Sequence, residues 1–198
     1  MRSSLLCLLA LSLLVAACGP TPAPTSMPPS PVPTPDLSTR SDGGGDPRSP
    51  AYWLLWNGCA PDNRAAIAAA NGGRAAGWTL VDDLLADPGI TVGPLPVTGC
   101  PQAVDLLSAH DEADAAYALA AQLLAARLNL AAGAEHCPAV QRALDDADRL
   151  LSDLAFDGSG TYLAPTAPGR DQAPPKALTA VALRDQLQTY NAGALCRP

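Results

Sequence analysis

The chain has 198 residues and a formal net charge of -7 at pH 7, with 12 Lys and Arg against 19 Asp and Glu. This acidic balance argues against a nucleic-acid partner and against a polybasic membrane-binding surface, because both need clustered Lys and Arg. The length leaves room for one ordinary domain with a sizeable hydrophobic core.

The N-terminal segment is typical of a secretory signal. Arg2 is the only charge before the apolar run Leu5–Leu14, and small residues then lead to Cys18. A Cys after Val15-Ala16-Ala17 resembles a bacterial lipobox, in which the Cys is lipidated and becomes the mature N-terminus. The run is too short for a transmembrane helix, which needs roughly 20 apolar residues. We expect residues 1–17 to be a lipoprotein signal peptide and Cys18 the lipidation site; a plain signal peptide with a chance Cys is the alternative.

Residues 18–50 are rich in Pro, Thr and Gly. Such sequence cannot bury a core and favours extended polyproline II structure. We therefore expect residues 18–50 to be a lipidated Cys followed by a disordered tether, which would hold a folded domain away from the membrane. A Thr/Pro tract of this kind can also carry O-glycans, which the sequence does not decide.

Residues 51–198 predict a single, mainly α domain: a small disulfide-stapled helical bundle with a short β-hairpin at most. The segment is rich in Ala and Leu and has few β-branched runs, which favours helices. The predicted elements, in chain order, are a helix over 62–70, a helix over 80–86, a hairpin of 90–92 with 95–97, and helices over 101–109, 112–132, from 137 onward and over 176–190.

Capping signals and periodicity support the longer helices. Asp62 or Asn63 predicts the cap of the first helix, Thr79 that of the second, and Asp111 that of the longest. Gly133 and the Asn191-Ala192-Gly193 run predict two of the ends. Apolar residues recur at helical spacing in three helices: Tyr117, Leu124, Leu128 and Ala131; then Val140, Leu144, Ala147, Leu151 and Leu154; then Leu183, Leu187 and Tyr190. If each helix hides one such face, together they form a bundle.

The cysteines predict two disulfides. Cys7 leaves with the signal peptide and Cys18 carries lipid, so four remain: Cys59, Cys100, Cys137 and Cys196. An even number in an exported domain allows three pairings. We expect Cys59–Cys100 and Cys137–Cys196, because antiparallel packing of the helix that starts at Cys137 and the last helix would bring Cys137 and Cys196 together. A zinc site is the weaker alternative, since no Cys-x-x-Cys occurs.

Three stretches are together similar to an exported bacterial domain of unassigned activity. They are Tyr52-Trp53-Leu54-Leu55-Trp56-Asn57, Tyr117 to Asn129 with its Leu-Ala-Ala-Gln-Leu-Leu-Ala-Ala-Arg-Leu-Asn helix, and Leu187-Gln188-Thr189-Tyr190-Asn191. Such domains open with Gly-Tyr-Trp-Lys-Asn-Trp and carry cysteines at the positions that correspond to the four here. This chain departs at Ala51, Leu54 and Leu55, which replace Gly, Lys and Asn. The resemblance implies an exported helical domain and adds no catalytic residue.

Motifs for catalysis, cofactors or metals are weak, and we expect none of these sites. Residues 72–79 nearly spell a nucleotide-binding P-loop, but Trp78 replaces its Lys and no strand precedes it. His110 and His136 lack the pairing on one helix face that a metal site favours. Asp157, Ser159 and Thr161 begin like a calcium loop, but the Gly and closing Glu of that loop are missing.

Tyr52, Trp53, Trp56 and Trp78 are the best candidates for ligand or partner contact, because Tyr and Trp serve as large binding anchors. The alternative is that they close one end of a core that is otherwise poor in aromatic residues. With a single Phe in the chain, we favour the structural interpretation.

The sequence therefore predicts an extracytoplasmic lipoprotein, anchored to the cell membrane by lipid, with a non-catalytic structural or binding module. A cell-wall, glycan or protein partner would suit it, whereas no nucleotide or nucleic acid is expected. The alternative is an exported hydrolase whose acids, such as Asp82 with Asp83, converge only in three dimensions. A deep cleft lined by two close carboxylates would favour the hydrolase.

Overall fold

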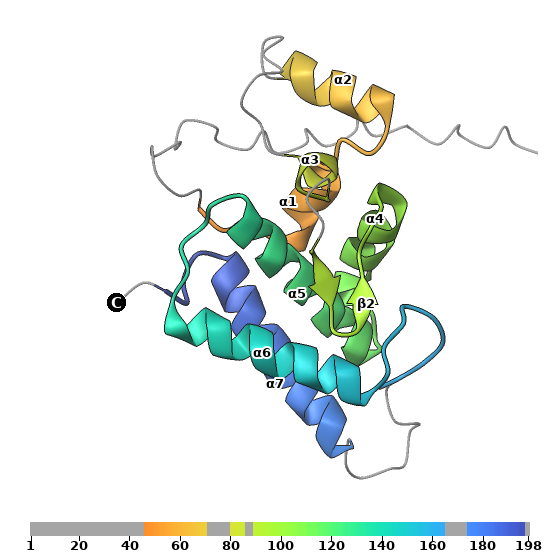
Figure 1. The fold of residues 1–198 in the computed structure, drawn as a ribbon, viewed down its shortest axis with the longest axis vertical. Coiled ribbons are helices and arrows are strands. Elements are labelled where there is room, and N and C mark those ends of the chain that lie inside the picture. The colour runs from red at the N-terminus through yellow and green to blue at the C-terminus, as the bar shows by residue number, and fades with distance from the viewer. Residues whose placement is uncertain (1–45, 71–79, 86–88, 165–173, 197–198) are drawn as a thin grey trace, which may run out of the picture. The chain divides into compact units, whose positions relative to one another are not determined.

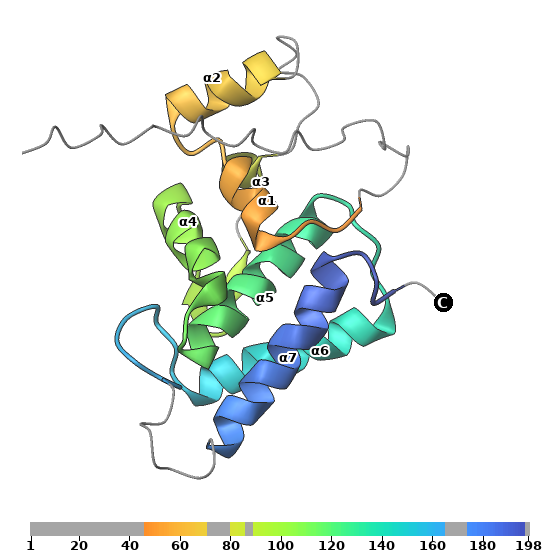
Figure 2. The ribbon, with the colours of Figure 1, turned by 180° about the vertical axis from the view of Figure 1, so that it is seen from behind.

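The computed structural model describes residues 46–70, 80–85, 89–164 and 174–196. Within these ranges the chain is mainly helical, with one short antiparallel hairpin (Figures 1 and 2). The elements are α1 (Pro50–Leu55), α2 (Pro61–Ala70), α3 (Val81–Leu85), β1 (Thr91–Val92), β2 (Leu95–Pro96), α4 (Cys100–Ser108), the 3-10 helix η1 (Ala109–Asp111), α5 (Ala115–Ala131), α6 (Pro138–Asp153) and α7 (Pro175–Asn191). The predicted fold class is confirmed.

Helix α5 is the centre of the bundle. It packs against α1, α4, α6 and α7, which surround it in Figures 1 and 2. The sequence predicted one apolar stripe along this helix, but the structure buries it on nearly every side, as its composition, mostly Ala and Leu, allows. Its many Ala side chains are small, so the neighbouring helices approach closely.

Helices α6 and α7 bury the faces that their periodicity predicts. Val140, Leu144, Ala147 and Leu151 are buried on α6, while Leu154 is half-buried at its end. Leu183, Leu187 and Tyr190 are buried on α7. The two helices run antiparallel: the Lys176 ammonium donates to the Asp153 carbonyl at one end, 3.4 Å away, and Cys137 bonds to Cys196 at the other.

Three helices end in the same hydrogen-bonded turn, in which a residue of positive φ follows the cap. Gly133 after α5 (φ 88°) and Gly193 after α7 (φ 76°) confirm the predicted ends. After α6 this position is Ala155, with φ 50°. The Ala155 N–H donates to the Ser152 carbonyl and the Phe156 N–H to the Leu151 carbonyl. An L-residue other than Gly or Asn is strained there, so α6 pays a small steric cost at its end.

The predicted start of α5 is wrong by one turn. Asp111 lies in η1, and Glu112 is extended, so the cap is Asp114. The Asp114 carboxylate accepts from the Ala116 N–H at 2.9 Å. It also accepts from the Tyr162 and Leu163 N–H groups, at 2.8 and 3.0 Å, on the loop after α6. These long-range hydrogen bonds favour Asp114 over Asp111 as the N-cap of α5.

The N-terminal boundary also differs from the prediction. The sequence placed residues up to 50 in the tether and predicted no helix around the aromatic cluster. In the structure, the Arg48 N–H donates to Asn129 Oδ1 at 2.8 Å, and α1 begins at Pro50. The Ser49 hydroxyl caps α1 by accepting from the Tyr52 N–H. The packed domain therefore begins at least three residues before Ala51.

The hairpin, α2 and α3 lie close to the positions that the sequence predicts. The hairpin pairs Thr91 with Pro96 and Val92 with Leu95, as predicted. Helix α2 begins at Pro61, so the expected caps Asp62 and Asn63 lie inside its first turn. Helix α3 has the expected position, whereas its expected cap, Thr79, lies outside the described residues.

The buried apolar side chains form two groups. The main core gathers around α5 and includes Trp53, Phe156 and Tyr190. A satellite cluster consists of Trp56, Ile67 and Leu80, and Tyr52 packs against both this cluster and the main core. No helix in the described part of the chain is long and apolar enough to cross a membrane.

Candidate functional site

Trp53, a candidate ligand contact, is part of the main core. It is only 2% exposed, and its indole N–H donates to Asn129 Oδ1 at 3.1 Å. A buried indole whose N–H has found a partner is held in place at both its apolar and its polar end. Trp53 is therefore held inside the main core at both ends of its side chain.

Trp56 and Tyr52 form a stacked pair at the satellite cluster. Their ring centroids lie 5.7 Å apart with the planes 14° from parallel, and Trp56 is 5% exposed. The Arg48 guanidinium lies over the Tyr52 ring, 5.2 Å from its centroid. Burial raises the pKa of Tyr52, and the Arg48 charge offsets part of this shift. Tyr52 is thus the half-exposed member of the candidate set, while Trp78 lies outside the described residues.

A buried polar network joins the three stretches on which the family resemblance depends. Asn129 on α5 accepts from Trp53 of the first stretch and donates to Asn191 Oδ1 on α7 at 2.8 Å. Asn191 in turn donates to the Gln122 side chain, Oε1, at 2.9 Å and to the Gln122 carbonyl at 3.0 Å. Asn129 also donates to the Arg48 carbonyl at 2.8 Å.

This network locks α1, α5 and α7 in one register, because burying any of its amides without its partners is costly. Sequence reasoning named Trp53 but missed Gln122, Asn129 and Asn191 as a set. Two amides seven residues apart in a helix made mostly of Ala and Leu were the available signal. Their partner on α7 is 62 residues from Asn129, so periodicity could not identify it.

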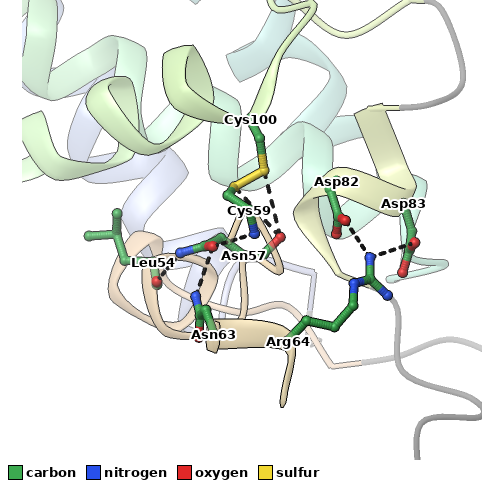
Figure 3. The surroundings of a disulfide bond; sticks show 8 residues. All are labelled: Leu54, Asn57, Cys59, Asn63, Arg64, Asp82, Asp83 and Cys100. Atoms are coloured by element: carbon green, nitrogen blue, oxygen red, sulfur yellow. Dashed lines mark hydrogen bonds and ion pairs between the residues drawn. A yellow bond between two sulfur atoms is a disulfide. The ribbon is translucent and has the colours of Figure 1, made fainter. Parts of the chain in front are cut away.

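The Cys59–Cys100 disulfide lies beside a hydrogen-bonded turn centred on Asn57 (Figure 3). The Asn57 amide donates to the Leu54 carbonyl at 2.6 Å, and its Oδ1 accepts from the Cys59 N–H at 2.7 Å and from the Asn63 amide at 2.8 Å. Its carbonyl accepts from the Asp82 N–H at 3.2 Å. Asn57 thus connects the end of α1 with both α2 and α3.

The two carboxylates of the hydrolase alternative are bound to a cation. Asp82 and Asp83 both accept from the Arg64 guanidinium, with the Arg64–Asp83 contact at 3.2 Å (Figure 3). These hydrogen bonds, that of Asp82 first, raise the pKa of Arg64. The pair therefore links α3 to α2 at the surface, and no observation favours it as a pair of catalytic acids.

The remaining candidate polar residues make local contacts. Tyr162 donates its hydroxyl to Asp157, and Ser159 donates its N–H to the same carboxylate at 2.9 Å; these bonds lower the pKa of Asp157. His110 contacts the Leu107 carbonyl, and His136 contacts Gln141, on different parts of the surface. Within the described ranges no three His, Cys, Asp or Glu side chains gather as metal ligands would.

An open groove of about 290 Å³ lies between α5, α6 and the residues before β1. Ile90, Leu130 and Leu144 give it an apolar lining, and Arg127 and Asp145 are polar residues at its edge. The Arg127 guanidinium donates to Thr91 at 3.1 Å and pairs with Asp148, so it joins the hairpin to α6. These two guanidinium contacts are directed to the fold, whereas Arg127 Nε is buried and has no hydrogen-bond partner among the described residues.

Comparison of the chain with protein-family models, with curated proteins and with solved structures found no match. The resemblance to an exported bacterial domain therefore stays a prediction.

Proposed function

We propose that this chain is an extracytoplasmic lipoprotein, anchored through Cys18, whose helical domain is a non-catalytic structural or binding module. The observation that carries the proposal is the pair of disulfides, Cys59–Cys100 and Cys137–Cys196, which are those expected from the sequence. Two disulfides suggest an oxidising, extracytoplasmic environment, because cytosolic thiols are kept reduced. The lipobox-like segment before Cys18 supports a lipid anchor in that environment.

The non-catalytic part is supported by what the chemistry-bearing side chains do. The four domain cysteines are bonded to one another, so none supplies a thiolate nucleophile. Asp82 and Asp83 are held by Arg64, and Trp53 is bonded inside the core. These residues hold the fold together, which is what a domain built to persist outside the cell needs. A cell-wall, glycan or protein partner would contact its outer surface.

Metabolic labelling with a clickable fatty acid tests the anchor. Wild-type protein should take up the label and sediment with membranes. Cys18→Ala should lose both properties, since the thiol that carries the lipid is gone. Cys7→Ala is the matched control, because it removes a cysteine from the signal segment and should leave labelling intact. Labelling that persists in Cys18→Ala, or that is absent from wild type, would overturn the proposed anchor.

Thiol counting on the same samples tests the compartment. A maleimide reagent of high mass should leave the protein unmodified until a reductant is added, and then shift it by four additions for the four domain cysteines. Modification before reduction would show that the protein resides in a reducing compartment, against the proposal.

A further inference from the structure

Helix α2 has one buried side chain among those that the structure describes. Ile67 is buried in the satellite cluster, whereas the other described α2 side chains are exposed or half-buried: Asp62, Asn63, Arg64, Ala65, Ala66 and Ala69. An Ala-rich helix of ten residues is marginal by itself in water. The folded state of α2 therefore depends on a small number of tertiary contacts.

Besides the burial of Ile67, two contacts connect the described part of α2 to its neighbours. At the N-terminal end, Cys59 is bonded to Cys100, and Asn63 donates to Asn57 (Figure 3). One turn further, Arg64 reaches across to Asp82 and Asp83 on α3, where all three side chains are at least 29% exposed. The first contact is covalent and sits at the base of the helix, whereas the second is an exposed ion pair that salt can screen.

We propose that α2 is a hinged cover over Trp56 that opens while the main core stays folded. The disulfide holds the base of the helix at Cys59, and Arg64 acts as an electrostatic latch to α3. Opening lifts Ile67 away from Trp56 and Leu80, which are then exposed to solvent. The main core should stay folded, because its buried side chains are a different set from those of the satellite cluster, and Tyr52, which packs against both, keeps its contact with Trp53. Segments with few buried apolar contacts are those that open locally.

Hydrogen exchange measured by mass spectrometry on the full oxidised chain tests the cover. In wild type, the α2 amides should exchange at least about 100-fold faster than those of α5, which are protected by the main core. Arg64→Ala should speed α2 exchange a further two- to fivefold, roughly the effect of losing exposed ion pairs. Raising NaCl to 1 M should produce a similar increase in wild type and none in Arg64→Ala.

Arg149→Ala is the matched control, because Arg149 also forms an exposed pair, with Asp146 on α6. It should leave α2 exchange unchanged. Ile67→Ala is a second variant, which removes the buried anchor and should speed α2 exchange more than tenfold with α5 unaffected.

Three results would overturn the proposal. If α2 and α5 exchange at the same rate, or if Ile67→Ala accelerates both, α2 does not open independently. If neither Arg64→Ala nor salt changes α2 exchange, Arg64 is not a latch. None of these readouts depends on lipidation, so a failure here is distinct from a failure of the proposed membrane anchor.

Discussion

The main core and the satellite cluster are stabilised by different interactions. The main core surrounds a helix buried on nearly every side and contains a buried amide network. The satellite cluster has three buried apolar side chains, a disulfide and an exposed ion pair. Each contains one tryptophan from the same short stretch, Trp53 in the core and Trp56 in the satellite. Neighbouring residues of one motif therefore lie in two different clusters of buried side chains.

The two tryptophans give the largest expected contrast. Trp53→Ala should lower the free energy of unfolding by about 4 kcal/mol, since it leaves a large cavity and removes one of the two hydrogen bonds to Asn129 Oδ1. Trp56→Ala should cost about 1–2 kcal/mol, because the satellite cluster can come apart while the main core persists. Denaturant unfolding with the disulfides intact measures both. Equal costs would show that the two clusters unfold as one cooperative unit.

Removing the disulfide of the main core should destabilise the protein more than removing the disulfide beside the satellite cluster. On the chain-entropy model, each stabilises by about 4 kcal/mol, for loops of 59 and 41 residues. We expect the full loss from Cys137→Ser/Cys196→Ser, because that bond ties α6 to α7 in the main core.

Cys59→Ser/Cys100→Ser should release the satellite cluster and cost the main core clearly less than the model value. Thermal melts that follow tertiary structure, with hydrogen exchange of α2 and α5, separate these outcomes. If Cys59→Ser/Cys100→Ser reduced the exchange protection of α5 more than Cys137→Ser/Cys196→Ser does, the expected order of the two disulfides would be wrong.

Alkaline pH probes a tyrosine in each region. Burial, with a smaller effect of the Glu135 charge, raises the pKa of Tyr190 to about 12. In the unfolded chain the Tyr190 hydroxyl loses its proton near pH 10, whereas in the folded protein it keeps the proton to higher pH. The free energy of unfolding therefore has its full Tyr190 contribution below pH 10 and decreases as the pH rises toward 12. The total is on the order of 2 kcal/mol.

Tyr190→Phe should remove most of this pH dependence, at the expense of the hydrogen bond to the Glu135 carbonyl. Tyr52→Phe is the matched control in the satellite cluster and should change the alkaline slope less, since Arg48 favours the ionised form of Tyr52. Urea unfolding between pH 8 and 11 provides the measurement. An unchanged slope in Tyr190→Phe would assign the dependence to other groups.

The smallest expected effect is an increase in the free energy of unfolding. Ala155→Gly should stabilise the domain by about 1 kcal/mol, because Gly adopts the positive φ at the end of α6 without steric strain. Exchange of α2 should not change, since the substitution acts on the main core alone. A loss of stability would show that the entropy of the unfolded Gly chain outweighs the relieved strain.

The sequence predicted those features whose causes lie within a few residues. The α6 stripe, the Gly stops after α5 and α7, and the hairpin depend on local spacing and turn residues, and all are present. Local sequence could not identify Asp114 rather than Asp111 as the N-cap of α5, because the deciding partners, Tyr162 and Leu163, are 48 and 49 residues away.

Helix α1 was missed for the same reason. It has six residues, and Trp53 orients it by bonding to Asn129, 76 residues further along the chain. Trp53 is buried and bonded within the main core, but sequence alone could not divide Trp53 and Trp56 between two clusters.

The amide network has a consequence for how this domain can change over generations. Gln122, Asn129 and Asn191 are linked in series by buried hydrogen bonds, so a substitution at one removes a hydrogen bond from the buried amide of another. Descendants should therefore alter these positions jointly or not at all. Correlated variation among the three, with Trp53 as the fourth member, would be a signature by which distant relatives could be recognised after the rest of the sequence has diverged.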